Sequence, residues 1–204
     1  MLKQPSMFPI FLKLEGRRVL VVGAGTVAEG KIRGLLDSGA AIDVVAPEAV
    51  PQVQQWAEDG AISWAQRKFE PGDLDQVSLV VAATSSHELN KKVFQQARKR
   101  NVLCNAVDDP ENCDFYYPAV VKRGDLQIAI STNGRSPALA QRLRQELEEQ
   151  FGPEYELWLQ ELGEERNRLM STGLNVEDRK KLLHRLASRE AFSNRNTAQR
   201  GRIN

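Results

Sequence analysis

Short apolar runs alternate with amphipathic stretches through the first half of the chain. The runs are rich in Val, Ile and Ala, which is typical of parallel strands buried on both faces. They predict strands at residues 18–22, 42–46, 78–83 and 102–106, with a weaker edge strand at 62–65. The stretches between them predict helices at residues 26–38, 49–58 and 87–99. This alternation predicts an α/β fold in which helices cover both faces of a parallel sheet.

The pattern changes after Val107. Residues 115–121 and 126–131 predict an antiparallel pair of strands, because the residues between them are typical of a reverse turn. Ser136 and Pro137 then predict the start of a helix, along which leucines recur every four residues (Leu139, Leu143 and Leu147). Two more helices are predicted at residues 154–170 and 176–191, before a polar tail at 193–204.

A glycine-rich turn follows the first predicted strand. Residues 23–28 read Gly-Ala-Gly-Thr-Val-Ala, a G-x-G-x-x-A pattern between a strand and a helix. Gly23 permits the turn, Gly25 lacks the Cβ that would block a diphosphate, and Ala28 lets the helix and strand pack closely. The diphosphate then binds backbone N–H groups at the helix N-terminus. The pattern favours a Rossmann-like dinucleotide-binding domain over the alternative, a tight turn with no ligand.

Composition narrows the class of protein. The 204 residues have a net charge of +1, and 41% of them are hydrophobic, as in ordinary globular chains. We therefore expect neither nucleic acid nor a membrane as a partner, and no apolar run approaches the ~20 residues of a membrane span. Cys104 and Cys113 form no disulfide framework and no metal-ligand set, so we expect reduced thiols and no metal site. Residues 1–5 lack a secretory apolar stretch, which predicts a cytoplasmic protein.

Pro47 and Glu48 follow the second predicted strand, at the carboxyl edge of the sheet where such folds bind ligands. An acid at this place can hold ribose hydroxyls. Alternatively, Glu48 lies in the first turn of the next helix and interacts with its dipole. No Arg or Lys lies between Val44 and Gln66 to meet a 2′-phosphate, which favours NAD over NADP.

Ala83 ends the strand at 78–83 and Thr84 follows it, so both reach the same edge, where Thr84 can contact the cofactor. Ser86 is a candidate cap of the following helix. His87 stands in the first turn of that helix, where we expect an exposed side chain rather than a catalytic imidazole.

A third polar group, Asn105 to Asp109, leaves the last predicted parallel strand. We expect Asn105 near the cofactor, and Asp108 at the nicotinamide end as a general base while a hydride leaves. The alternative for Asp108 is an ordinary turn residue, which is also our interpretation of Asp109 before its proline.

A polar loop precedes the helix that begins at Ser136. Its helix N-terminus is suited to binding an anion, and we expect substrate contacts from Ser131, Thr132, Asn133 and Arg135. Arg135 can meet carboxylates, whereas Arg142 and Arg144 on the helix are equally typical of solvated charges.

Five segments together resemble the precorrin-2 dehydrogenase / sirohydrochlorin ferrochelatase family, of the siroheme-synthase N-terminal type. They are Phe8–Phe11, Val21–Glu29, Ala83–Thr84, Cys104–Asp108 and Ile130–Pro137. The resemblance covers roughly residues 7 to 190, with the motifs in matching order.

The resemblance implies NAD-dependent oxidation of precorrin-2 to sirohydrochlorin, and in some members the insertion of ferrous iron. It implies a homodimer, and Asp108 as the essential aspartate. The NAD contacts it implies are Gly25, Thr26, Val27, Pro47 and Glu48, with Ala83 and Thr84 beside them. We accordingly expect an NAD-binding domain at residues 7–112, a dimerisation segment at 113–150 and a C-terminal helical domain at 151–192.

Some fused members carry a modifiable serine where this chain has Thr132, so we expect no such regulation. The methyltransferase domain of fused members is also missing, so we expect another protein to supply the methylation. Two alternatives to the dehydrogenase remain. One is a regulatory module that senses NAD without turnover, and the other is a ferrochelatase with a vestigial nucleotide site.

Overall fold

The computed structural model describes the backbone of residues 7–200 and the side chains of residues 7–195. The chain forms two compact units, which meet in the sequence between Tyr117 and Pro118.

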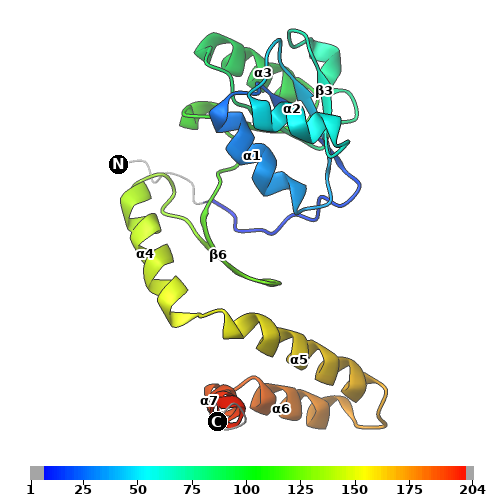
Figure 1. The fold of residues 1–204 in the computed structure, drawn as a ribbon, viewed down its shortest axis with the longest axis vertical. Helices are drawn as coiled ribbons and strands as arrows, with labels where there is room; N and C mark the ends of the chain where they lie inside the picture. Colours follow the sequence, from blue (N-terminus) through cyan, green and yellow to red (C-terminus); the bar gives the residue numbers. More distant parts are fainter. Residues whose placement is uncertain (1–6, 201–204) are drawn as a thin grey trace. The chain divides into compact units, whose positions relative to one another are not determined.

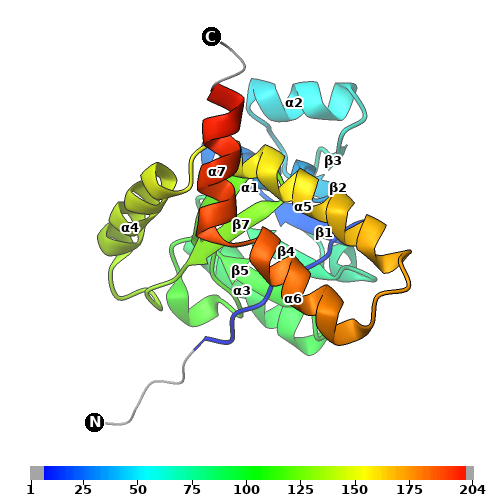
Figure 2. The same ribbon diagram turned by 90° about the horizontal axis from the view of Figure 1, so that it is seen from below.

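The first unit contains a parallel sheet of five strands in the order β3-β2-β1-β4-β5. Figure 1 labels β3 and the helices of this unit, and Figure 2 labels all five strands. The strands are β1 (Arg18–Val22), β2 (Ala41–Val45), β3 (Ser63–Ala65), β4 (Leu79–Ala82) and β5 (Leu103–Ala106). Val22 is in register with Val45 on one side and Ala82 on the other, and Ala82 is in register with Ala106. The carboxyl ends of these four strands therefore meet at one edge of the sheet.

Helices cover both faces of this sheet. Successive residues of each strand face opposite sides, and both sides carry apolar residues that the helices bury. The helices are α1 (Thr26–Leu36), α2 (Pro51–Glu58) and α3 (His87–Lys99), with short 3-10 turns η1 (Pro71–Leu74) and η2 (Pro110–Asn112). Val19 and Val21 pack with α1 and α2 in one buried cluster. Leu20 and Val22 pack with α3 and η1 in the other. The predicted α/β fold and its parallel sheet are confirmed.

The second unit begins with an antiparallel pair, β6 (Ala119–Arg123) and β7 (Leu126–Ile130). Four helices follow: α4 (Pro137–Gln150), α5 (Glu154–Met170), α6 (Val176–Leu186) and α7 (Arg189–Arg200). The Arg123 side chain donates hydrogen bonds to the carbonyls of Glu148 and Phe151. These bonds give partners to carbonyl groups at the C-terminal end of α4.

An aromatic cluster joins α5 to α7 in the second unit. The Phe192 ring centroid lies 4.4 Å from that of Tyr155 and 4.7 Å from that of Trp158. Figure 1 shows α5 and α6 running side by side before the chain enters α7. Aromatic pairs at these distances stabilise helix packing.

Two expectations for this part of the chain were wrong. The first strand of the pair covers 119–123 rather than 115–121, because Phe115 packs against the core of the first unit. The last helix was expected over 176–191, but α6 ends at Leu186 and a new helix begins after Ser188. The Ser188 hydroxyl accepts the Ala191 N–H and caps that helix.

The tail expected at 193–204 is therefore helical through Arg200, and residues 201–204 lie outside the described part. The first unit continues through Tyr117. The expected domains at residues 7–112, 113–150 and 151–192 stay predictions.

Gly23 permits the first turn to approach β4. Its φ is +106°, and a Cβ at this position would lie 2.5 Å from the carbonyl oxygen of Ala83. We predict that Gly23→Ala lowers the free energy of unfolding by about 2–4 kcal/mol, because it adds both backbone strain and a clash. Urea unfolding followed by circular dichroism measures this change.

Gly30→Ala is the matched control, since a Cβ there meets no atom of the described residues within 4 Å. This change within α1 should stabilise the protein by ~0.5–1 kcal/mol. Equal stability of Gly23→Ala and the unmodified protein would contradict the steric account of the turn.

Candidate functional site

The turn from β1 into α1 leaves open space at the N-terminus of the helix. Gly25 is the N-cap, with extended backbone angles, and it offers no side chain to the N–H groups of the first turn. A Cβ on Gly25 would meet no atom within 4 Å in the described part of the chain. Thr26 and Val27 beside it are exposed. Unpaired N–H groups facing open space are suited to a diphosphate.

The loop after β2 runs beside this turn. Ala46 is buried and its carbonyl accepts a hydrogen bond from the Trp64 indole, while the Val50 N–H donates to the carbonyl of Ala24. Pro47 and Glu48 between them are exposed. Because α2 begins at Pro51, Glu48 lies before the helix and not in its first turn. The alternative that placed Glu48 in the first turn of this helix is therefore wrong.

The loop after β4 is held by a buried asparagine that we did not anticipate. The Asn90 side chain on α3 is 4% exposed, accepts hydrogen bonds from the Thr84 N–H and hydroxyl, and donates to the Thr84 carbonyl. Ser86 caps α3 by accepting the Leu89 N–H, as expected. Asn90 thus fixes Thr84 at the carboxyl edge. A polar residue on the apolar face of a predicted helix was the available signal.

Asn105 at the end of β5 is also buried, and its amide is used within the protein. It donates a 2.8 Å hydrogen bond to the Phe115 carbonyl. This contact holds the segment from Cys113 to Phe115 against the sheet, where Cys113 forms an isolated bridge with Asn105. Cofactor contact by Asn105 stays a prediction.

Asp108 and Asp109 lie in different surroundings although they are neighbours. Asp108 is exposed and adopts a left-handed backbone with φ of 59°. Asp109 is 6% exposed and accepts a 2.6 Å hydrogen bond from the Asn112 amide. Its carboxylate also lies 3.4 Å from Nδ1 of His87, whose side chain is exposed as expected. The Asp109–His87 pair is a feature that sequence reasoning missed.

Both cysteines are free, and both thiols are held in the protonated form. Burial raises the pKa of Cys104 to about 12. Burial is also the largest influence on Cys113 and raises its pKa, although a hydrogen bond to Ala106 opposes it. Since only a thiolate is nucleophilic, cysteine chemistry does not account for this site.

The predicted substrate loop belongs to the second unit. The Thr132 hydroxyl donates to the Ser136 carbonyl and accepts the Ser136 N–H, while the Ser131 hydroxyl accepts the Asn133 N–H. Ser136 caps α4, as expected. Arg135 is exposed. The loop is therefore ordered by its own side chains, and the N-terminus of α4 follows it directly.

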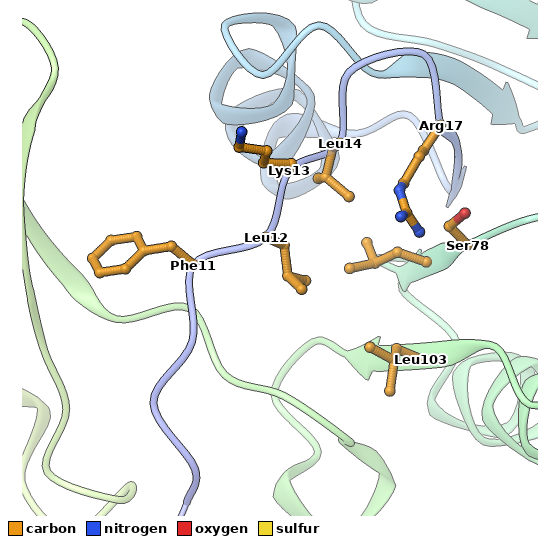
Figure 3. Close-up of a pocket in the computed structure, with 8 residues that line it drawn as sticks. Phe11, Leu12, Lys13, Leu14, Arg17, Ser78 and Leu103 are labelled. Carbon is orange, nitrogen blue, oxygen red and sulfur yellow. The ribbon is translucent and has the colours of Figure 1, made fainter. Parts of the chain in front are cut away.

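A pocket of about 200 Å³ lies at the edge of the sheet where the strands begin, opposite the carboxyl edge (Figure 3). It is lined by Leu12, Leu14, Arg17, Ser78, Leu79 and Leu103, among others. These residues precede or begin the strands, so the pocket is separate from the glycine turn.

No helix within residues 7–200 is long and apolar enough to cross a membrane. Within the described residues, no group of three or more His, Cys, Asp or Glu is arranged to hold a metal ion.

Family models match both units. A model described as putative NAD(P)-binding matches residues 10–119, and one described as sirohaem biosynthesis protein central matches residues 123–150. Siroheme synthase of Photorhabdus laumondii is 45% identical over 140 residues, which is 69% of this chain and 30% of that protein. Siroheme synthase 2 of Yersinia enterocolitica is 38% identical over 186 residues, 91% of this chain and 39% of that protein. The chain thus spans 30–39% of the length of these two relatives.

Among solved structures, SirC, a precorrin-2 dehydrogenase, matches with a TM-score of 0.80 and 33% identity. The match covers 90% of this chain and 91% of SirC, so it includes both units.

Gly25→Asp tests the cofactor site without disturbing the fold. Aspartate is a favoured N-cap and fits the observed backbone angles, so thermal stability should not fall. Its carboxylate would occupy the N–H groups that a diphosphate needs and would repel that diphosphate. We expect NAD affinity, measured by calorimetry, to fall by about 100-fold or more, the loss of roughly 3 kcal/mol.

Gly34→Asp adds the same side chain near the other end of α1, where it too meets no described atom within 4 Å, and should leave NAD affinity unchanged. Unchanged affinity in Gly25→Asp would rule out the glycine turn as the diphosphate site.

Proposed function

We propose that this chain, which belongs to the siroheme-biosynthesis family that includes the precorrin-2 dehydrogenase SirC, oxidises precorrin-2 to sirohydrochlorin with NAD. The match to SirC over both units supports this activity. The single observation on which it depends is that an exposed carboxylate, Asp108, follows β5 at the sheet edge that also carries the glycine turn.

The residues at this edge fit a dinucleotide. The space that a Cβ on Gly25 would fill is open, and no side chain of the described residues caps the N–H groups in the first turn of α1. Gly23, Gly25, Thr26 and Val27 would hold the diphosphate, and Pro47 and Glu48 the ribose. Ala83, Thr84 and Asn105 would lie beside the nicotinamide half. When bound, NAD supplies the acceptor for the hydride that the oxidation removes.

We assign Asp108 the role of the base that accepts the proton lost together with this hydride. The oxidation removes one hydride and one proton from the macrocycle, so it needs a base near the reacting carbon. A carboxylate oxygen of Asp108 takes that proton, and the exposure of the side chain lets the proton pass on to water. Asp109 is buried against Asn112 and His87, so it is the less accessible of the two acids.

Substrate binding is assigned to the loop before α4. Precorrin-2 carries eight carboxylates, and a helix N-terminus with an exposed arginine is suited to such groups. Ser131, Thr132, Asn133 and Arg135 would make these contacts. Ferrous iron insertion into sirohydrochlorin is a second activity of the same site, in which Asp108 would accept pyrrole protons as iron enters as a substrate.

A homodimer and a cytoplasmic location complete the proposal. Leu139 on α4 is 48% exposed and Val120 on β6 is 37% exposed, so this unit presents apolar surface that a second copy would cover.

The alternative function is a module that senses NAD without turnover. Such a module would need no base beside the cofactor, whereas the Asp108 carboxylate is available for one.

Asp108→Asn removes the charge while retaining the turn, because asparagine tolerates the left-handed backbone that Asp108 adopts. We expect precorrin-2 turnover to fall by at least ~100-fold, the low end of what a positioned base contributes. The assay follows sirohydrochlorin by absorbance, with NAD affinity measured in parallel and expected to be unchanged.

Asp125→Asn, in the turn between β6 and β7, is the matched control and should retain turnover. An Asp108→Asn variant that oxidises precorrin-2 at the unmodified rate would make Asp108 a turn residue only.

A further inference from the structure

Lys31 occupies an unusual place for a lysine in the first unit. It lies on α1 and is half-buried, whereas every other lysine among residues 7–117 is exposed. Its Nζ is 3.8 Å from the centroid of the Tyr117 ring, a close cation–π contact. A long, flexible side chain is therefore held in one place.

The Tyr117 ring is itself fixed by the core. Its centroid lies 5.7 Å from that of Phe115, which packs against the cluster under α1. The Phe115 carbonyl accepts the hydrogen bond from the buried Asn105. The end of β5 thus positions the ring, and the ring positions the ammonium.

The ammonium of Lys31 lies in the field of Asp108. Burial is the largest influence on Lys31 and lowers its pKa, and the charge of Asp108 acts in the opposite direction. The Tyr117 ring also favours the charged form. The general base and this cation therefore share one region of the site.

Lys31 nevertheless has no carboxylate partner among the residues that the structure describes. In the described part of the first unit, Arg18, Arg33 and Arg67 each form an ion pair with an acid. No acid of the described residues lies within 4 Å of the Lys31 ammonium, and no described group accepts a hydrogen bond from it. A partly desolvated ammonium gains most from a carboxylate that arrives with a ligand.

We propose that Lys31 anchors a side-chain carboxylate of the tetrapyrrole beside Asp108 and so sets the position of the macrocycle over the base. This inference rests on the proposed function, since it takes its ligand from that reaction. It adds a substrate-binding residue on α1 of the first unit.

The test compares binding of sirohydrochlorin, the reaction product, in the absence of NAD. Lys31→Gln should weaken binding by about 10-fold or more, the loss of one hydrogen bond to a charged group. Lys31→Arg should remain within about 3-fold of the unmodified protein, since it keeps a charged donor. Lys92→Gln, an exposed lysine on α3, is the matched control and should bind normally. Absorbance titration gives the dissociation constants.

Kinetics separate anchoring from an effect on the base. Lys31→Gln should raise KM for precorrin-2 by about the factor lost in binding, while kcat changes by less than about 3-fold. Tyr117→Leu, which removes the ring but keeps Lys31, should weaken sirohydrochlorin binding in the same direction. NAD affinity should be unaltered in every variant, which also checks that each is folded.

The outcomes are distinct. If the unmodified protein binds sirohydrochlorin and Lys31→Gln binds it equally well, the inference fails and the proposed function stands. If Lys31→Gln shifts the pH profile of kcat without changing binding, Lys31 acts on Asp108 and the anchoring role is also rejected. If the unmodified protein binds no sirohydrochlorin, both the inference and the proposed function fail.

Discussion

The site depends on how closely the turn after β1 approaches the end of β4. Gly23 faces the Ala83 carbonyl at a distance that excludes any Cβ, and its N–H donates to the Val45 carbonyl on the other side. These contacts hold the carboxyl ends of three strands together. The helix N-terminus at Gly25, the loop after β2 and the Thr84 loop all start from this junction, so the geometry for a dinucleotide follows from one steric constraint.

The position of the proposed base, Asp108 after β5, depends on a hydrogen bond rather than on a steric constraint. The buried Asn105 amide holds Phe115 against the sheet, which makes the chain turn back after Asp108. Asp108 stands at the left-handed position of that turn and is exposed, while Asp109 is buried with Asn112. The same returning segment carries Tyr117 to Lys31. One internal hydrogen bond therefore organises both the proposed base and the proposed anchor.

The sequence predicted those features that follow from local rules. The glycine turn, the parallel strands and the caps Ser86 and Ser136 each depend on a few neighbouring residues, and they are present. The segment from Cys113 to Tyr117 was predicted to be partly a strand, because its apolar character is visible but its hydrogen bond to Asn105 is not. Lys31 and the Asp109–His87 pair were missed because each depends on residues far away in the sequence. Asn90 was missed although its partner Thr84 is only six residues away, because its polar side chain on the apolar face of the helix was not taken as a signal. The break before α7 was missed because Ser188 stands within an amphipathic pattern that looks continuous.

The central claim is that the protein uses the residues at the carboxyl edge of the parallel sheet to oxidise a tetrapyrrole rather than only to bind a nucleotide. The most direct measurement mixes the purified protein with precorrin-2 and NAD under anaerobic conditions and follows NADH and sirohydrochlorin together by absorbance. The account predicts that one NADH forms for each sirohydrochlorin, and that neither forms at an enzymatic rate when NAD is omitted. A protein that binds NAD by calorimetry but leaves precorrin-2 unchanged would contradict it and would favour a nucleotide sensor.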